Sequence, residues 1–172
     1  MKRLLILATP FIFLSCEPQE NQQIILYEGP SKEGDKVEVY HSEGEHVKVK
    51  MIADKYLELQ NGDLEFPQGI YLEFYDEAGA LSSTLIANSA YYFKDEDKWR
   101  GRGKVEVKNI LKNEQLNTEE LFWKPDTQKI FTDKFVTIRL AAEVIYGTGL
   151  MANQDLSSYT ITKPAGEFVI ED

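Results

Sequence analysis

The sequence predicts an all-β domain built from repeated hairpin-like units, and three observations lead to this prediction. The first is an internal repeat over residues 85–139, which aligns when the sequence slides 31 positions along itself. The matched pairs include Leu85 with Leu116, Tyr91 with Phe122, Tyr92 with Trp123 and Val105 with Val136. The second is an alternation of apolar and polar residues along most of the chain, and the third is the lack of helical apolar spacing. A fixed period of this size is typical of units that bury their apolar faces against one another.

Length and composition favour one globular domain. The chain has 172 residues, of which 42% are hydrophobic and 12% aromatic, so a sizeable core is expected. Aromatic residues on alternating strands suit sheet faces and an apolar cavity. A formal net charge of -10 argues against a nucleic-acid partner, because such proteins present a basic surface to the phosphates.

The N-terminus has the pattern of a secretory signal. Lys2 and Arg3 precede an apolar run over residues 4–14, which is too short to span a bilayer, and a small residue, Ser15, follows. We therefore expect residues 1–15 to form a signal peptide.

Cys16 directly follows this signal and is the only cysteine. It allows neither an intramolecular disulfide nor a cysteine metal cluster. The arrangement resembles a lipobox, the signal of bacterial lipoproteins, in which the cysteine thiol is acylated. This resemblance implies lipid attachment at Cys16, a tether over residues 16–23, and a domain over residues 24–172. An uncleaved anchor, or an ordinary signal with an incidental cysteine, is the alternative.

Strands are expected wherever the alternation is clear. In order, these segments are residues 24–27, 37–39, 47–51, 57–59, 70–75, 105–107, 136–140, 144–146, 159–161 and 168–170. The Asn61-Gly62 pair predicts a hairpin turn, and polar turns are expected at residues 94–98 and 125–129. Gly101 and Gly103 are expected to let their strand bend or bulge.

No pattern in the sequence indicates catalysis, a cofactor or a metal. His41 and His46 lie in a glycine-containing turn, without the ligand set of a closed metal site. The chain has no nucleophile elbow and no phosphate loop. The segment of residues 100–103, RGRG, is not followed by a helix whose amides would converge on a phosphate.

Four blocks of sequence resemble a known family. They are LIANSAYY (residues 85–92), GKVEV (103–107), LNTEELFW (116–123), and YGTGL with SYTI (146–150 and 158–161). Their order and spacing are similar to those of LptC, the periplasmic component of the lipopolysaccharide export (Lpt) machinery, within the OstA-like superfamily. The resemblance covers roughly residues 51–161.

The resemblance implies an open, twisted β-jellyroll of two facing antiparallel sheets, whose apolar interior holds the acyl chains of lipid A. It also implies a non-catalytic role. Such a protein accepts lipopolysaccharide from an inner-membrane ABC transporter and passes it along a bridge of β-jellyrolls toward the outer membrane. Residues expected to line the lipid groove are Ile70, Leu72, Phe74, Val105, Val107, Val136, Ile138 and Leu140; packing as plain core is the alternative for each.

Neighbouring jellyrolls of this family dock through unpaired strand edges. By this resemblance, Ile24, Ile25 and Leu26 would meet the periplasmic domains of the Lpt transporter. Tyr159 and Ile161 would meet an LptA-like bridge protein. The expected location is the periplasm, with the lipid anchor in the inner membrane.

Two other functions fit the sequence. One is a related bridge protein that stacks head to tail into filaments, which would normally lack an anchor. The other is a cell-envelope lipoprotein with a structural role, or with a closed β-barrel that binds a small apolar ligand. A closed barrel would cap its pocket, whereas the repeats predict an open-ended stack.

Overall fold

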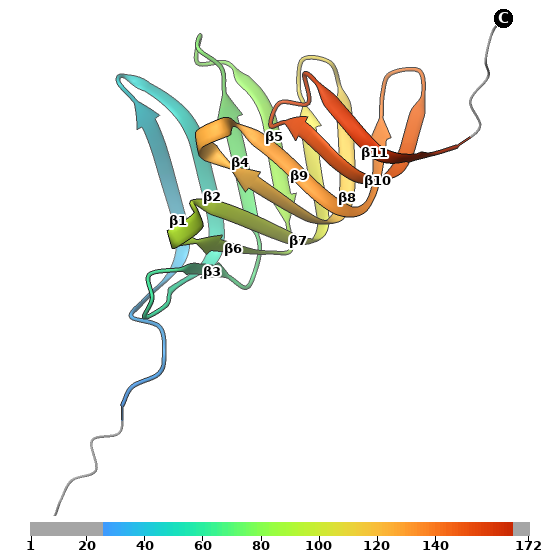
Figure 1. Ribbon diagram of the computed structural model, residues 1–172. Coiled ribbons are helices and arrows are strands. Elements are labelled where there is room, and N and C mark those ends of the chain that lie inside the picture. The colour runs from blue at the N-terminus through green and yellow to red at the C-terminus, as the bar shows by residue number, and fades with distance from the viewer. Residues whose placement is uncertain (1–25, 167–172) are drawn as a thin grey trace, which may run out of the picture.

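The computed structural model describes residues 26–166, which form a bent antiparallel sheet (Figure 1). Its strands are β1 (Lys32–Glu43), β2 (His46–Glu58), β3 (Leu64–Phe66), β4 (Ile70–Tyr75), β5 (Leu81–Ala87), β6 (Ser89–Phe93), β7 (Lys98–Asn109), β8 (Glu114–Lys124), β9 (Lys129–Arg139), β10 (Val144–Asn153) and β11 (Tyr159–Ala165). Two short 3-10 turns, η1 (Lys94–Glu96) and η2 (Pro125–Thr127), complete the described secondary structure. Over this part of the chain, no helix has the length and apolar character needed to cross a membrane.

All eleven strands belong to one hydrogen-bonded sheet. The short strands β3 and β4 continue one another along β2, and β5 and β6 continue one another along β7. If β3 with β4, and β5 with β6, are each counted as one strand, every strand pairs only with the strand before it and the strand after it in the sequence. Among residues 26–166, β1 pairs only with β2 and β11 only with β10, so this part of the chain forms a sheet with two free edges that does not close into a barrel.

A line of irregularities crosses the strands near their middles. On β7, Arg102 pairs with Glu120 while Val105 pairs with Thr118, so two residues of β7 lie opposite one residue of β8. Gly103, one of these two, has a φ of 73°, which glycine adopts without steric cost. The backbone N–H of Asn88, between β5 and β6, donates to the Gly103 carbonyl at 3.0 Å. The expected bulge is therefore confirmed at Gly103, whereas Gly101 pairs regularly with Leu121. Bulges of this kind increase bending and twist.

The bend brings the two halves of the sheet face to face. The rings of Phe74 on β4 and Trp123 on β8 have centroids 5.2 Å apart, although β5 and β7 lie between these strands in the sheet. In Figure 1, β9 and the orange 3-10 turn before it cross in front of β4. The all-β, jellyroll-like fold is thus confirmed, with its two facing layers formed by one continuous sheet.

The internal repeat is visible in the backbone. η1 and η2 occupy equivalent turns, and each is followed by a left-handed residue, Asp97 (φ 42°) and Gln128 (φ 53°). These two residues are 31 positions apart, as the sequence repeat requires. Most of the alternating apolar residues expected to face inward lie in the core, among them Val107, Val136 and Ile138, each with no exposed surface, whereas Val39 is 47% exposed.

The first expected strand is wrong for the residues that can be described. Leu26 and Tyr27 are irregular and exposed, and the sheet begins instead at β1. Ile24, Ile25, the signal segment, Cys16 and the strand expected at residues 168–170 lie outside the described residues. Only residues 37–39 of β1 were expected to form a strand. β1 is an edge strand rich in charged residues, so its apolar alternation covers only part of its length.

Candidate functional site

A cavity of about 730 Å³ lies between the two layers. Its walls come from β1 and β2 on one side and from the turns containing η1 and η2 on the other. The loop between β10 and β11 also contributes. The apolar and aromatic lining residues are Val39, Val49, Met51, Leu72, Tyr75, Tyr92, Trp99, Trp123 and Pro125. A volume of this size is within the range of small-molecule and cofactor sites.

A chain of aromatic rings forms one wall of this cavity. Trp99 on β7 lies 6.1 Å from Trp123 on β8 and 4.9 Å from Tyr92 on β6, measured between ring centroids. Phe66 stacks on the other side of Trp99 at 5.6 Å. Pairs in this arrangement contribute about 0.5–1.5 kcal/mol beyond their buried area. The wall is therefore rigid and largely apolar.

The charged residues of the lining make it acidic. Its carboxylates are Glu43, Asp76, Glu77, Asp97, Asp126 and Asp155, against the two lysines Lys48 and Lys129. Lys48 pairs with Glu77 at 2.7 Å, and hydrogen bonding to this lysine, with its charge, lowers the pKa of Glu77. The lining therefore offers apolar surface together with negative charge, a combination that disfavours phosphate groups at the charged positions.

The predicted groove residues fall mostly in the packed core. Ile70, Leu72, Phe74, Val105, Val107, Val136 and Ile138 are buried, and Leu140 is half-buried against the core. Of these eight, only Leu72 lines the cavity. The assignment of the others to a lipid groove remains a prediction.

Sequence reasoning missed most of the cavity lining. Trp99 and Trp123 both appear in the repeat, but at positions that do not match each other. The pairing of β7 with β8 then places the two residues directly opposite each other. Two tryptophans near the polar turns of successive units were the available signal, because large aromatic residues are enriched where a fold presents apolar surface.

The two arginines of the RGRG segment do not form an anion site. The Arg100 guanidinium lies over the rings of Tyr91 and Phe93, at 5.6 and 5.3 Å from their centroids. Arg102 forms an ion pair with Glu120. Both side chains are thus engaged within the sheet.

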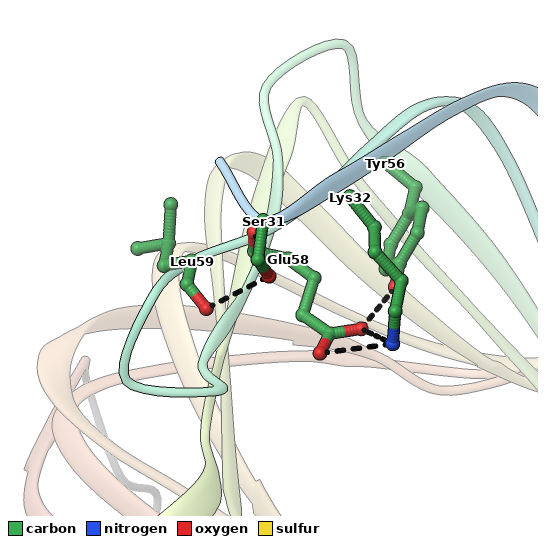
Figure 2. A network of polar contacts seen from close by, with 5 residues as sticks. All are labelled: Ser31, Lys32, Tyr56, Glu58 and Leu59. Atoms are coloured by element: carbon green, nitrogen blue, oxygen red, sulfur yellow. Dashed lines mark hydrogen bonds and ion pairs between the residues drawn. The ribbon is translucent and has the colours of Figure 1, made fainter. Parts of the chain in front are cut away.

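The N-terminal edge of the sheet is fixed by a polar network (Figure 2). Lys32 on β1 donates to both carboxylate oxygens of Glu58 on β2, at 3.2 and 3.0 Å, and the Tyr56 hydroxyl donates to the same carboxylate at 2.8 Å. The Ser31 hydroxyl donates to the carbonyls of Glu58 and Leu59. Hydrogen bonds from Lys32 and Tyr56 lower the pKa of Glu58. Leu26 precedes this fixed edge and is 78% exposed.

The C-terminal edge is β11, which confirms the late strand expected around Tyr159 and Ile161. Both side chains are half-buried and pack against the core. The other backbone edge of β11 has no partner strand within residues 26–166. This edge is open to a further strand.

A second polar cluster joins the turn after β2 to β6 and η1, and we expect it to make stability pH-dependent. Asp63 accepts the Lys94 backbone N–H at 2.9 Å and the Tyr91 hydroxyl at 2.8 Å. These bonds lower the pKa of the Asp63 carboxyl. Its contribution to stability is therefore present above the usual aspartate pKa and is lost as the pH falls through the lower, folded-state value.

Asp63→Asn should reduce the free energy of unfolding by roughly 1 kcal/mol at neutral pH, because an amide oxygen replaces two acceptor oxygens. It should also flatten the loss of stability below about pH 4. Urea unfolding at a series of pH values measures both effects. Asp95→Asn, at an exposed position on the neighbouring turn, is the control; an equal effect there would contradict the assignment.

A bent antiparallel sheet with free edges and a large cavity between its layers defines the class of open β-jellyroll proteins. The cavity has apolar walls, and among the described residues no three His, Cys, Asp or Glu side chains are grouped so as to hold a metal ion. The family model described as "Lipopolysaccharide-assembly, LptC-related" matches residues 4–164. The chain therefore belongs to this family. Comparison with curated proteins gives no significant match.

Membership implies a role in lipopolysaccharide transport, together with the Lpt machinery, on the periplasmic side of the envelope. This agrees with the resemblance seen in the sequence. The family is a lipid-transport component.

Proposed function

We propose that this protein is a non-catalytic periplasmic lipid-transfer component. It accepts lipopolysaccharide from an inner-membrane ABC transporter and passes it along a β-jellyroll bridge toward the outer membrane. The observation that carries this proposal is the cavity between the layers, with its wall of Leu72, Trp99 and Trp123, in a chain of this family.

Acyl chains suit such a wall. Contact between alkyl chains and apolar side chains is not directional, so a chain can slide along the wall without breaking specific bonds. Each methylene removed from water stabilises the complex by about 0.8 kcal/mol. The acidic lining residues disfavour the phosphates of lipid A, so the sugar and phosphate part of the ligand stays outside while the acyl chains enter.

The predicted groove residues take part in this proposal as the apolar layer behind the cavity. Leu72 contacts the ligand directly. An acyl chain reaches the other predicted groove residues only if it penetrates further between the layers. These residues are Ile70, Phe74, Val105, Val107, Val136 and Ile138, with Leu140 at their border.

The two sheet edges suit docking at either end of the domain. The N-terminal edge, with Ile24, Ile25 and Leu26 ahead of β1, meets the periplasmic domains of the transporter. The edge of β11, with Tyr159 and Ile161, meets an LptA-like bridge protein. Acylation of Cys16 and a tether over residues 16–23 would hold the domain at the inner membrane after removal of residues 1–15.

Photo-crosslinking in cells tests the proposal. A photoreactive residue at Val39, which lines the cavity and is 47% exposed, should form lipopolysaccharide adducts, as should one at Val49. Adducts should require an active transporter. Tyr40 is the matched control because it follows Val39 on the same strand, is 55% exposed and does not line the cavity.

Probes at Phe74, Val107 and Ile138, with Glu106 as the control, then test the deeper groove. Adducts there would show that the acyl chains reach the core. Equal labelling of Val39 and Tyr40, or none at either in a folded and anchored protein, would contradict transport through this cavity and favour a structural lipoprotein.

A further inference from the structure

One side chain of the core comes from a loop and not from a strand. Leu156 lies in the loop of residues 154–158, between β10 and β11, and is only 1% exposed. Its backbone is left-handed, with a φ of 57°. Leucine rarely adopts this conformation, because its Cβ crowds the backbone. Burial of the side chain therefore holds the loop in a conformation that leucine otherwise disfavours.

Polar side chains from three strands hold this loop to the opposite wall. The Ser83 hydroxyl on β5 donates to the Gln154 carbonyl at 3.2 Å, and the Asn109 amide on β7 donates to the Asp155 carbonyl at 2.7 Å. Trp123 Nε1 on β8 donates to the Gln154 side-chain oxygen at 2.9 Å. Ser83 and Asn109 are themselves buried, so two of the few buried polar residues of the interior bind this loop.

The same loop forms part of the cavity wall. Gln154 and Asp155 line the cavity, as do Ser82 and Trp123, which adjoin the loop's contacts. Leu156 follows directly in the chain and belongs to the core cluster. The loop therefore contributes to the cavity wall through Gln154 and Asp155 and to the adjoining core through Leu156.

This wall is easier to displace than the strands. A strand leaves only by breaking a row of backbone hydrogen bonds, whereas the loop is attached to other elements by the three side-chain bonds and by one backbone bond, from the Gln154 N–H to the Gln128 carbonyl at 3.0 Å. Water can replace the bonds to Ser83 and Asn109 once the loop moves. An alkyl chain can replace the apolar contacts of Leu156, because such contacts are not directional. Segments attached in this way open at lower free energy than the core strands do.

We propose that the volume filled by Leu156 is an alkyl-chain subsite. It opens when the loop of residues 154–158 moves outward and the end of a long saturated chain takes the place of the Leu156 side chain. A short chain fills the cavity alone and leaves the loop closed. The proposal rests on the proposed function, because it requires an acyl chain in the cavity.

Hydrogen exchange of the full chain with octanoate or palmitate tests the proposal. The Gln154 N–H of the loop donates to the Gln128 carbonyl, after η2, at 3.0 Å, and this bond breaks when the loop moves outward. Palmitate should accelerate exchange at the Gln154 amide by about tenfold, while octanoate should leave it unchanged. If palmitate binds and this amide keeps its protection, the subsite is refuted and the proposed function stands.

Leu156→Ala provides an independent test by calorimetry. Removing the side chain opens the subsite in advance, so the Kd for palmitate should fall about tenfold and the Kd for octanoate should not change. Leu121→Ala is the matched control, because Leu121 is equally buried but lies on a strand. An equal gain at Leu121 would reduce the effect to a general consequence of core cavities and overturn the subsite. Absence of fatty-acid binding in all three proteins would overturn both this proposal and the proposed function.

Discussion

Trp123→Ala is expected to lower the free energy of unfolding by about 3–5 kcal/mol, the usual cost of truncating a large buried aromatic residue. The indole is 7% exposed, meets Phe74 edge-on at 5.2 Å and donates to Gln154. The variant should also lose lipopolysaccharide binding, because this ring joins the cavity wall to the loop of residues 154–158. Urea unfolding followed by circular dichroism measures the first effect, and ligand binding below the transition measures the second.

Two variants separate the causes of this loss. Trp123→Phe keeps the ring contacts but removes the N–H, so it should cost about 1 kcal/mol and retain ligand binding. Phe122→Ala changes the neighbouring residue, which is half-buried and stacks on Phe131 at 5.4 Å. It should cost less than Trp123→Ala and leave the ligand bound. Equal losses of unfolding free energy in Phe122→Ala and Trp123→Ala would contradict the difference in burial between the two faces of β8.

Gly147→Ala should detach β11 from the sheet. A Cβ at this position would lie 2.3 Å from Ile161 Cγ2 and 2.8 Å from the Lys163 carbonyl oxygen. Backbone atoms in such a contact can be relieved only by moving the strand. We expect a loss of about 1–3 kcal/mol, together with faster exchange of the β11 amides. Docking of the bridge protein should fail while lipid binding at the cavity persists.

Gly79→Ala is the control for this substitution. Gly79 lies in the turn between β4 and β5 with a φ of 77°, and a Cβ there would meet nothing within 4 Å. The Gly79→Ala variant should therefore lose only about 1–2 kcal/mol of unfolding free energy, because alanine disfavours the left-handed conformation. The β11 amides should stay as protected from exchange as in the parent protein. Full protection of β11 in Gly147→Ala would refute the expected clash.

Much of the fold could be predicted because the relevant physics is local. Alternation of period two placed Val105, Val107, Val136 and Ile138 on the buried face. Gly103 indicated the bulge. The sequence repeat predicted the two equivalent polar turns, and the structure adds a left-handed residue after each of η1 and η2.

The cavity could not be predicted in the same way. Residues that pack in a core and residues that line a cavity show the same alternation in the sequence. Which of the two roles a residue takes depends on how the sheet bends. Leu72 and Phe74 alternate on the same face of β4, yet only Leu72 lines the cavity. The role of Leu156 was equally hidden, because a single leucine in a polar loop has no pattern.

The pairing order also has a consequence for how the fold can change in size. If β3 with β4, and β5 with β6, are each counted as one strand, each strand forms backbone hydrogen bonds only with its predecessor and successor, so a hairpin added to or deleted from the chain leaves every other pairing in place. Most folds with facing layers lack this freedom, because distant segments pair across them. Duplication of one unit of about 31 residues, the spacing of the repeat, would lengthen the sheet by one hairpin. The size of this fold can thus change in discrete steps, one repeat unit at a time.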